Sequence, residues 1–220
     1  MSAPARIGLF GGSFDPPHQA HLALARVAVE ELALDSLHWL PAGRPWQKPH
    51  ELASGEDRAA MVAAAIEEEP RFVLDRRELE RSGPSYTVDS ARELHAEHPQ
   101  ATLYLLIGQD QYEGLPTWHA WRELLLLVTL GVAARDGASV RPPAALQGVA
   151  HRAVPMSMRA MAVSSTSIRA HLAAGGSAQD LVPAVVPAGV ARYIDSHRLY
   201  RRAGTSFSTP CAPDGTPPRS

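Results

Sequence analysis

Ile7-Gly-Leu-Phe-Gly-Gly-Ser-Phe-Asp-Pro-Pro-His-Gln-Ala-His-Leu-Ala-Leu24 is the stretch from which the fold of this chain can be worked out. A short apolar run ends in Gly11 and Gly12, which allow backbone conformations that other residues resist. After His18 the apolar residues recur at helical spacing, so the stretch predicts a buried strand, a glycine turn and a helix. Such a turn directs backbone N–H groups and the positive end of a helix dipole toward one point. It therefore favours a bound anion, above all a phosphate.

Two histidines, His18 and His21, lie three residues apart in the first turn of this helix, so both rings can face the mouth of the glycine turn. There they can donate hydrogen bonds to a phosphate and offset charge that develops on it. Taken by itself, the stretch is also compatible with a plain structural turn. A metallohydrolase site that uses Asp15, His18 and His21 is another alternative, although zinc needs further ligands that the neighbouring residues do not obviously supply.

The composition of the 220 residues predicts one α/β domain with a proper core, because 45% of them are hydrophobic. The formal net charge of −2 offers no electrostatic footprint for nucleic acid or an anionic membrane, so neither is expected as a partner. The single cysteine, Cys211, excludes an internal disulfide and argues against a thiolate site. We expect a cytoplasmic protein, since no leader and no apolar run of about 18 residues is visible. The sequence leaves formation of a homo-oligomer open.

Strand and helix patterns alternate along the chain, which is typical of a Rossmann-like doubly wound parallel sheet with ligands across its carboxyl edge. Residues 1–202 are expected to form this single domain, and the Pro-, Ser- and Thr-rich residues 203–220 a disordered tail. Residues 76–81 are interpreted as an exposed charged connector and residues 136–148 as a surface loop without chemistry. The expected strands are 7–10, 36–40, 72–75, 102–107 and 128–133, and the expected helices begin near 18, 56, 85, 117, 165 and 187. Ser54, followed by Asp57, is expected to cap the second of these helices.

A second informative stretch, residues 161–169, has a pattern like that of the first, an apolar run followed by a helix start. The apolar run Met-Ala-Val is followed by hydroxyl residues at a helix start and by Arg169 in the first turn. Hydroxyl and N–H groups can bind phosphate oxygens, while a guanidinium adds charge in a fork geometry. Without further information, the same pattern is an ordinary helix cap followed by an exposed arginine.

The first stretch resembles the Gly-x-Phe-Asp-Pro-x-His-x-Gly-His signature of a nucleotidyltransferase superfamily, and within it the nicotinate-nucleotide adenylyltransferases. The second is similar to the Ser-Ser-Thr-x-Ile-Arg motif of the same superfamily. Gly-Pro-Ser-Tyr-Thr at 83–87 and the Ile-Gly-x-Asp and Pro-x-Trp runs between 107 and 118 resemble further stretches of the adenylyltransferases. One departure is Ala20, which stands where the signature has glycine and places a methyl group near the expected adenine.

The resemblance implies adenylyl transfer from ATP to nicotinate mononucleotide, which forms deamido-NAD and pyrophosphate in NAD biosynthesis by direct in-line attack without a covalent intermediate. Mg²⁺ would be carried mainly by the ATP phosphates, with no metal ligand from the chain, and the expected catalytic residues are His18, His21 and Arg169. The implied ATP-binding residues are Gly11, Gly12, Ser13, Phe14, His18, His21, Ser164, Ser165, Thr166 and Arg169. The implied residues for nicotinate mononucleotide are Lys48, Tyr86, Thr87, Asp110, Trp118 and Arg135.

Two other functions stay open at this point. One is an adenylyl- or cytidylyltransferase for another phosphorylated acceptor, such as phosphopantetheine. The other is a non-catalytic nucleotide-binding module, which would bind ATP without releasing pyrophosphate. Trp118 and the Tyr86-Thr87 pair favour a pyridine nucleotide, because the resemblance assigns the tryptophan to stacking on the nicotinate ring and the threonine to contact with this nucleotide.

Overall fold

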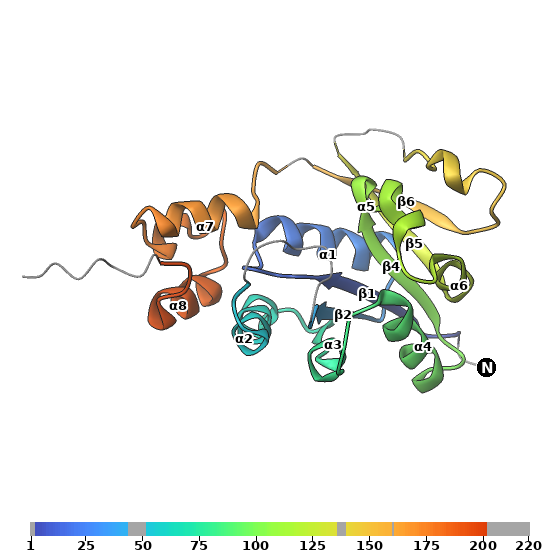
Figure 1. The fold of residues 1–220 in the computed structure, drawn as a ribbon, viewed down its shortest axis with the longest axis horizontal. Helices are drawn as coiled ribbons and strands as arrows, with labels where there is room; N and C mark the ends of the chain where they lie inside the picture. The colour runs from blue at the N-terminus through green and yellow to red at the C-terminus, as the bar shows by residue number, and fades with distance from the viewer. Residues whose placement is uncertain (1–2, 44–51, 136–139, 160, 202–220) are drawn as a thin grey trace, which may run out of the picture.

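The computed structural model describes residues 3–43, 52–135, 140–159 and 161–201. These residues form an α/β domain around a six-stranded sheet, in the order β3-β2-β1-β4-β5-β6, in which every adjacent pair is parallel (Figure 1). The predicted doubly wound parallel sheet is therefore confirmed. The strands are β1 (Arg6–Gly12), β2 (Ser36–Pro41), β3 (Phe72–Leu74), β4 (Thr102–Gly108), β5 (Val128–Arg135) and β6 (Ala153–Met158).

Helices cover both faces of the sheet. The α-helices are α1 (Gln19–Glu31), α2 (Gly55–Ile66), α3 (Arg77–Glu80), α4 (Thr87–Glu97), α5 (Gln109–Gly114), α6 (Trp121–Leu127), α7 (Ser165–Ala173) and α8 (Ala188–His197). Short 3₁₀ turns occur at Leu115–Thr117, Ala144–Leu146 and Ala178–Leu181. No helix among the described residues is both long and apolar enough to cross a membrane.

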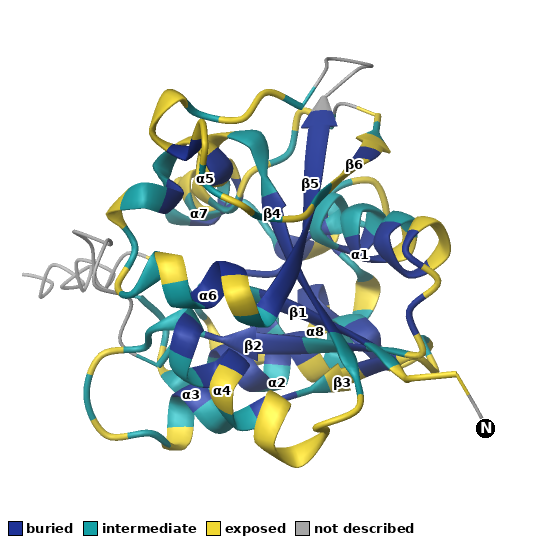
Figure 2. Cartoon of the chain, turned by 90° about the vertical axis from the view of Figure 1, so that its right-hand side faces the viewer, coloured by how far each residue is buried: buried dark blue, intermediate teal, exposed yellow. Residues whose placement is uncertain are grey.

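The central strands are buried along most of their length, because alternate side chains feed two separate cores (Figure 2). Ile7 and Leu9 of β1 pack with α4 and α6 on one face, whereas Phe10 packs with α1 and α2 on the other. Between them, Gly8 permits close packing, since a Cβ atom there would lie 2.6 Å from the side chains of Leu34 and Leu37. Glycine at this position is required by space rather than by backbone conformation.

A third apolar cluster joins α7 and α8 to α2, at the end of the sheet where α1 begins (Figure 1). Met61 of α2 is fully buried there against residues of both C-terminal helices. The predicted cap of α2 is confirmed: Ser54 Oγ accepts a hydrogen bond of 3.0 Å from the backbone N–H of Asp57. The C-terminal helices are therefore part of the same domain as the sheet.

Strand β6 was not predicted from the sequence, and the apolar run at 161–163 before the phosphate motif is not a strand. β6 lies at the edge of the sheet, contains Pro155 and buries only Met156, so it lacks the apolar pattern of a central strand. The predicted surface loop also contributes to the core between residues 140 and 148, because Leu146 is buried beside β5. Residues 136–139 of the predicted loop lie outside the described residues.

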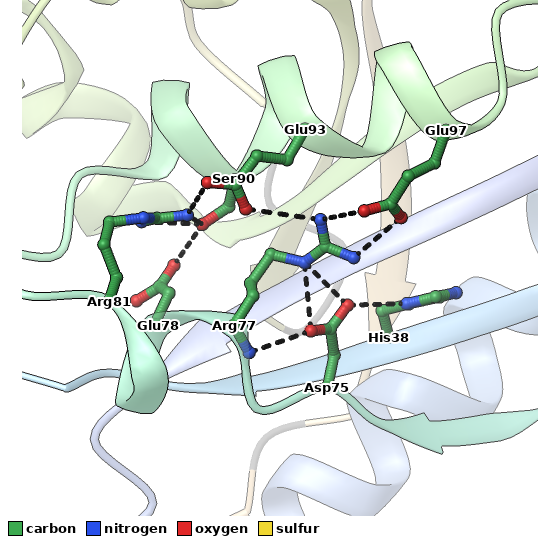
Figure 3. Close-up of polar contacts among 8 residues, drawn as sticks. All are labelled: His38, Asp75, Arg77, Glu78, Arg81, Ser90, Glu93 and Glu97. Atoms are coloured by element: carbon green, nitrogen blue, oxygen red, sulfur yellow. Dashed lines mark hydrogen bonds and ion pairs between the residues drawn. The ribbon is translucent and has the colours of Figure 1, made fainter.

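The segment 76–81, predicted to be an exposed connector, instead contains α3 and a polar network that joins β2 to α4 (Figure 3). The Arg77 guanidinium donates to Asp75 at 2.9 Å and to Glu97 at 3.0 Å, and His38 Nδ1 lies 2.9 Å from Asp75 Oδ2. Glu78 is buried and accepts a hydrogen bond of 2.9 Å from Ser90 Oγ. The arginines of this segment pair with carboxylates outside it, which is why the segment can lie partly buried between β2 and α4.

Burial tends to raise the pKa of Asp75, but hydrogen bonds from His38 and the Arg77 backbone, together with the Arg77 charge, outweigh this effect and lower it. We predict that Asp75→Asn destabilises the fold by about 3 kcal/mol at pH 7, because the change removes the buried carboxylate that pairs with the partly buried Arg77 guanidinium and with His38. Arg26→Ala, which breaks the exposed pair with Glu69, should cost at most about 1 kcal/mol. Urea unfolding of both variants measures the two effects.

The Asp75 contribution should also depend on pH in a defined direction. Because the pKa is lower in the folded state, the stabilisation is present above the unfolded-state pKa of about 3.9 and is lost as the pH falls through the folded-state value. The difference between wild type and Asp75→Asn should shrink accordingly in acid. Equal unfolding midpoints for the two proteins at pH 7 would show that the network does not stabilise the domain.

Candidate functional site

Gly11 and Gly12 are the last residues of β1 rather than a turn after it, because both still pair with β2. The segment 11–18, from these glycines to the start of α1, is called the glycine turn below; it lies where the sheet order reverses, with β1 between β2 and β4. A Cβ atom at Gly11 would meet no atom of the described chain within 4 Å, so this backbone borders open space. Phe14 has a left-handed backbone (φ 48°) and a buried ring. The ring packs under Gly12, and its centroid lies 5.2 Å from that of the His21 ring. The ring of Phe14 therefore supports the turn from below, and any contact of this residue with a nucleotide would come from its backbone.

The two histidines are brought together as predicted. His18 is the N-cap of α1, and its ring stacks on that of His21 with 3.7 Å between centroids. The backbone N–H of His18 donates to His21 Nδ1 at 3.2 Å, so a neutral His21 carries its proton on Nε2. Both rings thus share one volume at the end of the turn.

His18 is neutral at pH 7, because burial lowers its pKa to about 4. Its ring is 7% exposed, and Nδ1 has no hydrogen-bond partner among the described residues. A buried nitrogen without a partner is costly, so a ligand that supplies the missing hydrogen bond binds favourably. An anionic ligand would also favour the protonated imidazole.

The phosphate motif, residues 164–169, packs directly against the glycine turn although about 150 residues separate them. Ser164 caps α7 by accepting a hydrogen bond from the backbone N–H of Ser167 at 3.1 Å. Ser165 Oγ donates to the carbonyl of Pro16 at 2.9 Å, and Arg169 Nη1 donates to that of Asp15 at 2.7 Å. Thr166 Oγ1 lies 3.5 Å from Arg169 Nη2. The two motifs predicted to bind ATP are therefore in direct contact.

A buried charge cluster underlies the turn. Arg58 is 2% exposed and donates to the carbonyls of Ser13 at 3.0 Å and Ala53 at 3.1 Å. Burial lowers the pKa of Arg58, while the nearby charge of Asp15 opposes that effect. Asp15 Oδ1 accepts hydrogen bonds from Tyr200 Oη at 2.7 Å and from the Ala53 N–H at 3.2 Å. The hydrogen bonds of Asp15 run into the protein rather than toward the histidines, which does not favour the metallohydrolase alternative.

The described residues contain no group of three or more His, Cys, Asp or Glu side chains that could hold a metal ion. The side of the site that faces a phosphate instead offers hydroxyl groups, imidazoles and the Arg169 guanidinium. These groups complement an anion that brings its own counter-ion, such as a nucleotide carrying Mg²⁺ on its phosphates.

A cavity of about 180 Å³ adjoins the glycine turn on the side of β4. It brings together three residues predicted for nicotinate mononucleotide, namely Tyr86, Thr87 and Trp118. Trp121 does not line the cavity; it packs against the core, and the Arg122 guanidinium lies 4.2 Å from its ring. The lining consists of Gly11, Gly12, Ser13, Ala42, Glu78, Ser85, Tyr86, Thr87, Leu105, Leu106, Ile107, Gln111, Trp118 and His119.

Sequence analysis missed His119, Gln111 and Ser85 in this lining. The ring of His119 stacks on Tyr86 with 4.2 Å between centroids. The only feature of the sequence that could have indicated His119 is its position directly after Trp118. Thr117, expected to start a helix, instead donates to the Gly114 carbonyl at 2.7 Å, and α6 begins at Trp121. This 3₁₀ turn is what places Trp118 at the cavity.

Three predicted acceptor residues are not among the cavity residues. Asp110 is exposed in the first turn of α5, and Gln111 lines the cavity in its place. Lys48 lies outside the described residues. The backbone of Arg135 ends β5, but its side chain is also outside what the structure describes. Their assignments stay predictions.

Comparison with known proteins agrees with this geometry. The cytidylyltransferase-like family profile matches residues 9–171. A relative from Methylibium petroleiphilum is 60% identical over 90% of this chain and 94% of its own length, and one from Albidiferax ferrireducens is 45% identical over 90% and 99%. Both are named "Probable nicotinate-nucleotide adenylyltransferase".

A solved structure shows the same fold at low identity. Nicotinic acid mononucleotide adenylyltransferase from Plasmodium falciparum, complexed with NaAD, aligns with a TM-score of 0.72 and 19% identity over 89% of this chain and 97% of its own. The high identity of the bacterial relatives over nearly their full length, rather than this fold likeness, decides the family. The chain belongs to the nicotinate-nucleotide adenylyltransferase family.

Proposed function

We propose that this chain transfers the adenylyl group of ATP to nicotinate mononucleotide, which forms deamido-NAD and releases pyrophosphate. The observation that carries the proposal is the convergence of the His18–His21 pair and Arg169 on one turn, with an aromatic cavity beside it. Structures of the Plasmodium falciparum enzyme complexed with NaAD and with APC support a site of this kind for both nucleotides.

The chemistry needs little covalent help from the protein. The acceptor phosphate oxygen attacks the α-phosphorus of ATP, the bond to the pyrophosphate oxygen breaks, and the protein aligns the two nucleotides. His18 and His21 stabilise charge near the α-phosphate and the bridging oxygen, while Ser165, Thr166 and Arg169 hold the leaving pyrophosphate. Mg²⁺, held mainly by the phosphates, would neutralise part of their charge when bound.

The remaining ATP contacts are assigned to the turn and the helix caps. The backbone at Gly11 borders open space, where N–H groups of the turn would meet phosphate oxygens, and Ser164 caps α7 at the phosphate motif. The full proposed ATP set is Gly11, Gly12, Ser13, Phe14, His18, His21, Ser164, Ser165, Thr166 and Arg169.

Nicotinate mononucleotide would occupy the aromatic cavity. The half-buried indole of Trp118 provides a platform for the pyridine ring, and backbone N–H groups near Thr87 or Trp118 would receive the carboxylate. Tyr86 borders the same volume, and Lys48, Asp110 and Arg135 stay proposed contacts for the rest of the nucleotide. A cytoplasmic location and the absence of nucleic-acid and membrane partners stay predictions from the sequence.

The experiment that tests the function is an acceptor panel with ATP and Mg²⁺, scored for pyrophosphate. Nicotinate mononucleotide, nicotinamide mononucleotide and phosphopantetheine are the informative acceptors. Pyrophosphate release with the first supports the proposal. Release with phosphopantetheine alone would assign another transferase, and ATP binding without any release would indicate a non-catalytic module.

We predict a preference for nicotinate over nicotinamide mononucleotide of at least about 10²-fold in kcat/KM. Stacking on Trp118 cannot separate the two rings, because both present the same face. Backbone N–H groups can donate to both oxygens of a carboxylate, whereas the NH₂ of an amide would face these donors without an acceptor, which is unfavourable when buried. Equal values of kcat/KM for the two mononucleotides would rule out an all-donor pocket.

Trp118→Ala is expected to raise KM for the mononucleotide by about 5- to 150-fold, because stacking on an aromatic ring is typically worth about 1–3 kcal/mol. KM for ATP should change much less. Trp121→Ala is the matched control, since this tryptophan lies outside the cavity lining. Equal losses for ATP and the mononucleotide in Trp118→Ala would move the residue out of the acceptor site.

His18→Ala and His21→Ala should each lower kcat by a factor on the order of 10² or more while the protein stays folded. Each change removes a group that stabilises charge mainly in the transition state. His95→Ala, an exposed histidine of α4, serves as the control. Near-normal kcat in both site variants, measured by pyrophosphate release, would separate the histidines from the reaction centre.

A further inference from the structure

Tyr200, near the C-terminal end of the described chain, contacts Asp15 of the glycine turn, although 185 positions separate the two residues in the sequence. Its hydroxyl donates a hydrogen bond of 2.7 Å to Asp15 Oδ1 and also lies 3.8 Å from Met61 Sδ. Burial and the adjacent Asp15 carboxylate raise the pKa of Tyr200, so the hydroxyl keeps the proton that it donates. No motif in the sequence predicted this contact.

The Asp15 carboxylate is fully buried, and its two oxygens have different surroundings. Oδ1 is held by Tyr200 and by the Ala53 N–H, whereas Oδ2 has no hydrogen-bond partner among the described residues and lies 3.7 Å from Arg169 Nη1. That nitrogen instead donates to the Asp15 carbonyl at 2.7 Å. The two opposite charges are thus held just beyond the distance of a direct hydrogen bond.

A direct bond between Arg169 and the carboxylate would be a charge-assisted one, stronger than a bond to a neutral carbonyl. Rotation of the Asp15 carboxylate toward the guanidinium would make it, and such a rotation would break the bond from Tyr200. The tyrosine hydroxyl therefore opposes the collapse of Arg169 onto Asp15. In the observed arrangement Nη1 of Arg169 is bound to the turn, and Nη2 lies beside Thr166 in the phosphate motif.

We propose that Tyr200 is a positioning residue, which fixes the Asp15 carboxylate so that Arg169 keeps its Nη2 side directed to the phosphates of ATP. This inference rests on the proposed function for the role of Arg169. It adds a C-terminal residue, outside both nucleotide motifs, to the machinery that holds the leaving group.

A second tyrosine of the same region provides a matched control. The hydroxyl of Tyr193, in α8, also donates to a partly buried carboxylate, Asp57 Oδ1, at 3.0 Å. This bond likewise joins the C-terminal helices to α2. Asp57 in turn pairs with Ser54 at the cap of α2 rather than with Arg169. If C-terminal tyrosines only stabilise packing, Tyr193→Phe and Tyr200→Phe will change the melting temperature and leave catalysis alone.

The test uses the full-length chain. Tyr200→Phe should lower kcat about 10-fold, with KM for nicotinate mononucleotide within about twofold of wild type, since the loss falls on stabilisation of the leaving group. Tyr193→Phe should keep the wild-type kcat even where it lowers the melting temperature. Wild-type kcat in Tyr200→Phe, or an equal loss in both tyrosine variants, would overturn the proposal.

A double-mutant cycle tests whether Tyr200 acts through Arg169. In the Arg169→Ala background, Tyr200→Phe should lower kcat no further, because the group that it positions is gone. Losses that multiply would show a separate effect and contradict the mechanism.

Binding of ATP, measured by calorimetry, separates failure of this inference from failure of the proposed function. If wild type released no pyrophosphate with any acceptor, the proposed reaction would be wrong. The positioning role would then still require Tyr200→Phe to bind ATP about 3- to 10-fold more weakly than wild type, with Tyr193→Phe unchanged. Unchanged ATP affinity in that case would overturn it.

Discussion

The buried carboxylate of Asp15 is the group on which the geometry of the site depends. It follows β1 directly, and through its backbone and side chain it meets the Arg169 guanidinium, the Tyr200 hydroxyl and the Ala53 N–H. A charge without water is costly unless it is paired, so these partners cannot separate without loss of stability. The glycine turn, α2 and the C-terminal helices are therefore held in one arrangement. The groups proposed for catalysis, His18, His21 and Arg169, are therefore carried by elements that share this centre.

Around this centre the site divides into two halves across the glycine turn. On one side lie the stacked imidazoles of His18 and His21 and the hydroxyl cap of α7, which complement the phosphates of ATP. On the other side the aromatic cavity with Tyr86 and Trp118 suits the ring of an acceptor nucleotide. Because the sheet reverses its order at β1, both halves open at the same edge. An acceptor phosphate placed between them would lie next to the α-phosphate of ATP.

Burial is used differently in different parts of the molecule. His18 is buried without a hydrogen-bond partner for Nδ1 in the described structure, and this keeps it neutral and leaves it suited to an incoming anion. The polar network of Asp75 and Arg77 is largely buried with its charges paired, and it joins β2 and α3 to α4 (Figure 3). The buried polar group without a hydrogen-bond partner thus lies on the side proposed to bind the substrates. The buried polar groups that have their partners stabilise the scaffold.

The sequence by itself determined the alternation of strands and helices and the hydroxyl caps of α2 and α7, because these depend on local periodicity and turn chemistry. It did not reveal β6, whose edge position leaves only Met156 buried, or the network of residues 75–97, whose charges look exposed until their partners are known. The bond from Tyr200 to Asp15 and the place of His119 in the cavity were decided only by the tertiary structure. Such contacts depend on which distant segments the sheet order brings together, and no pattern within one segment carries that information.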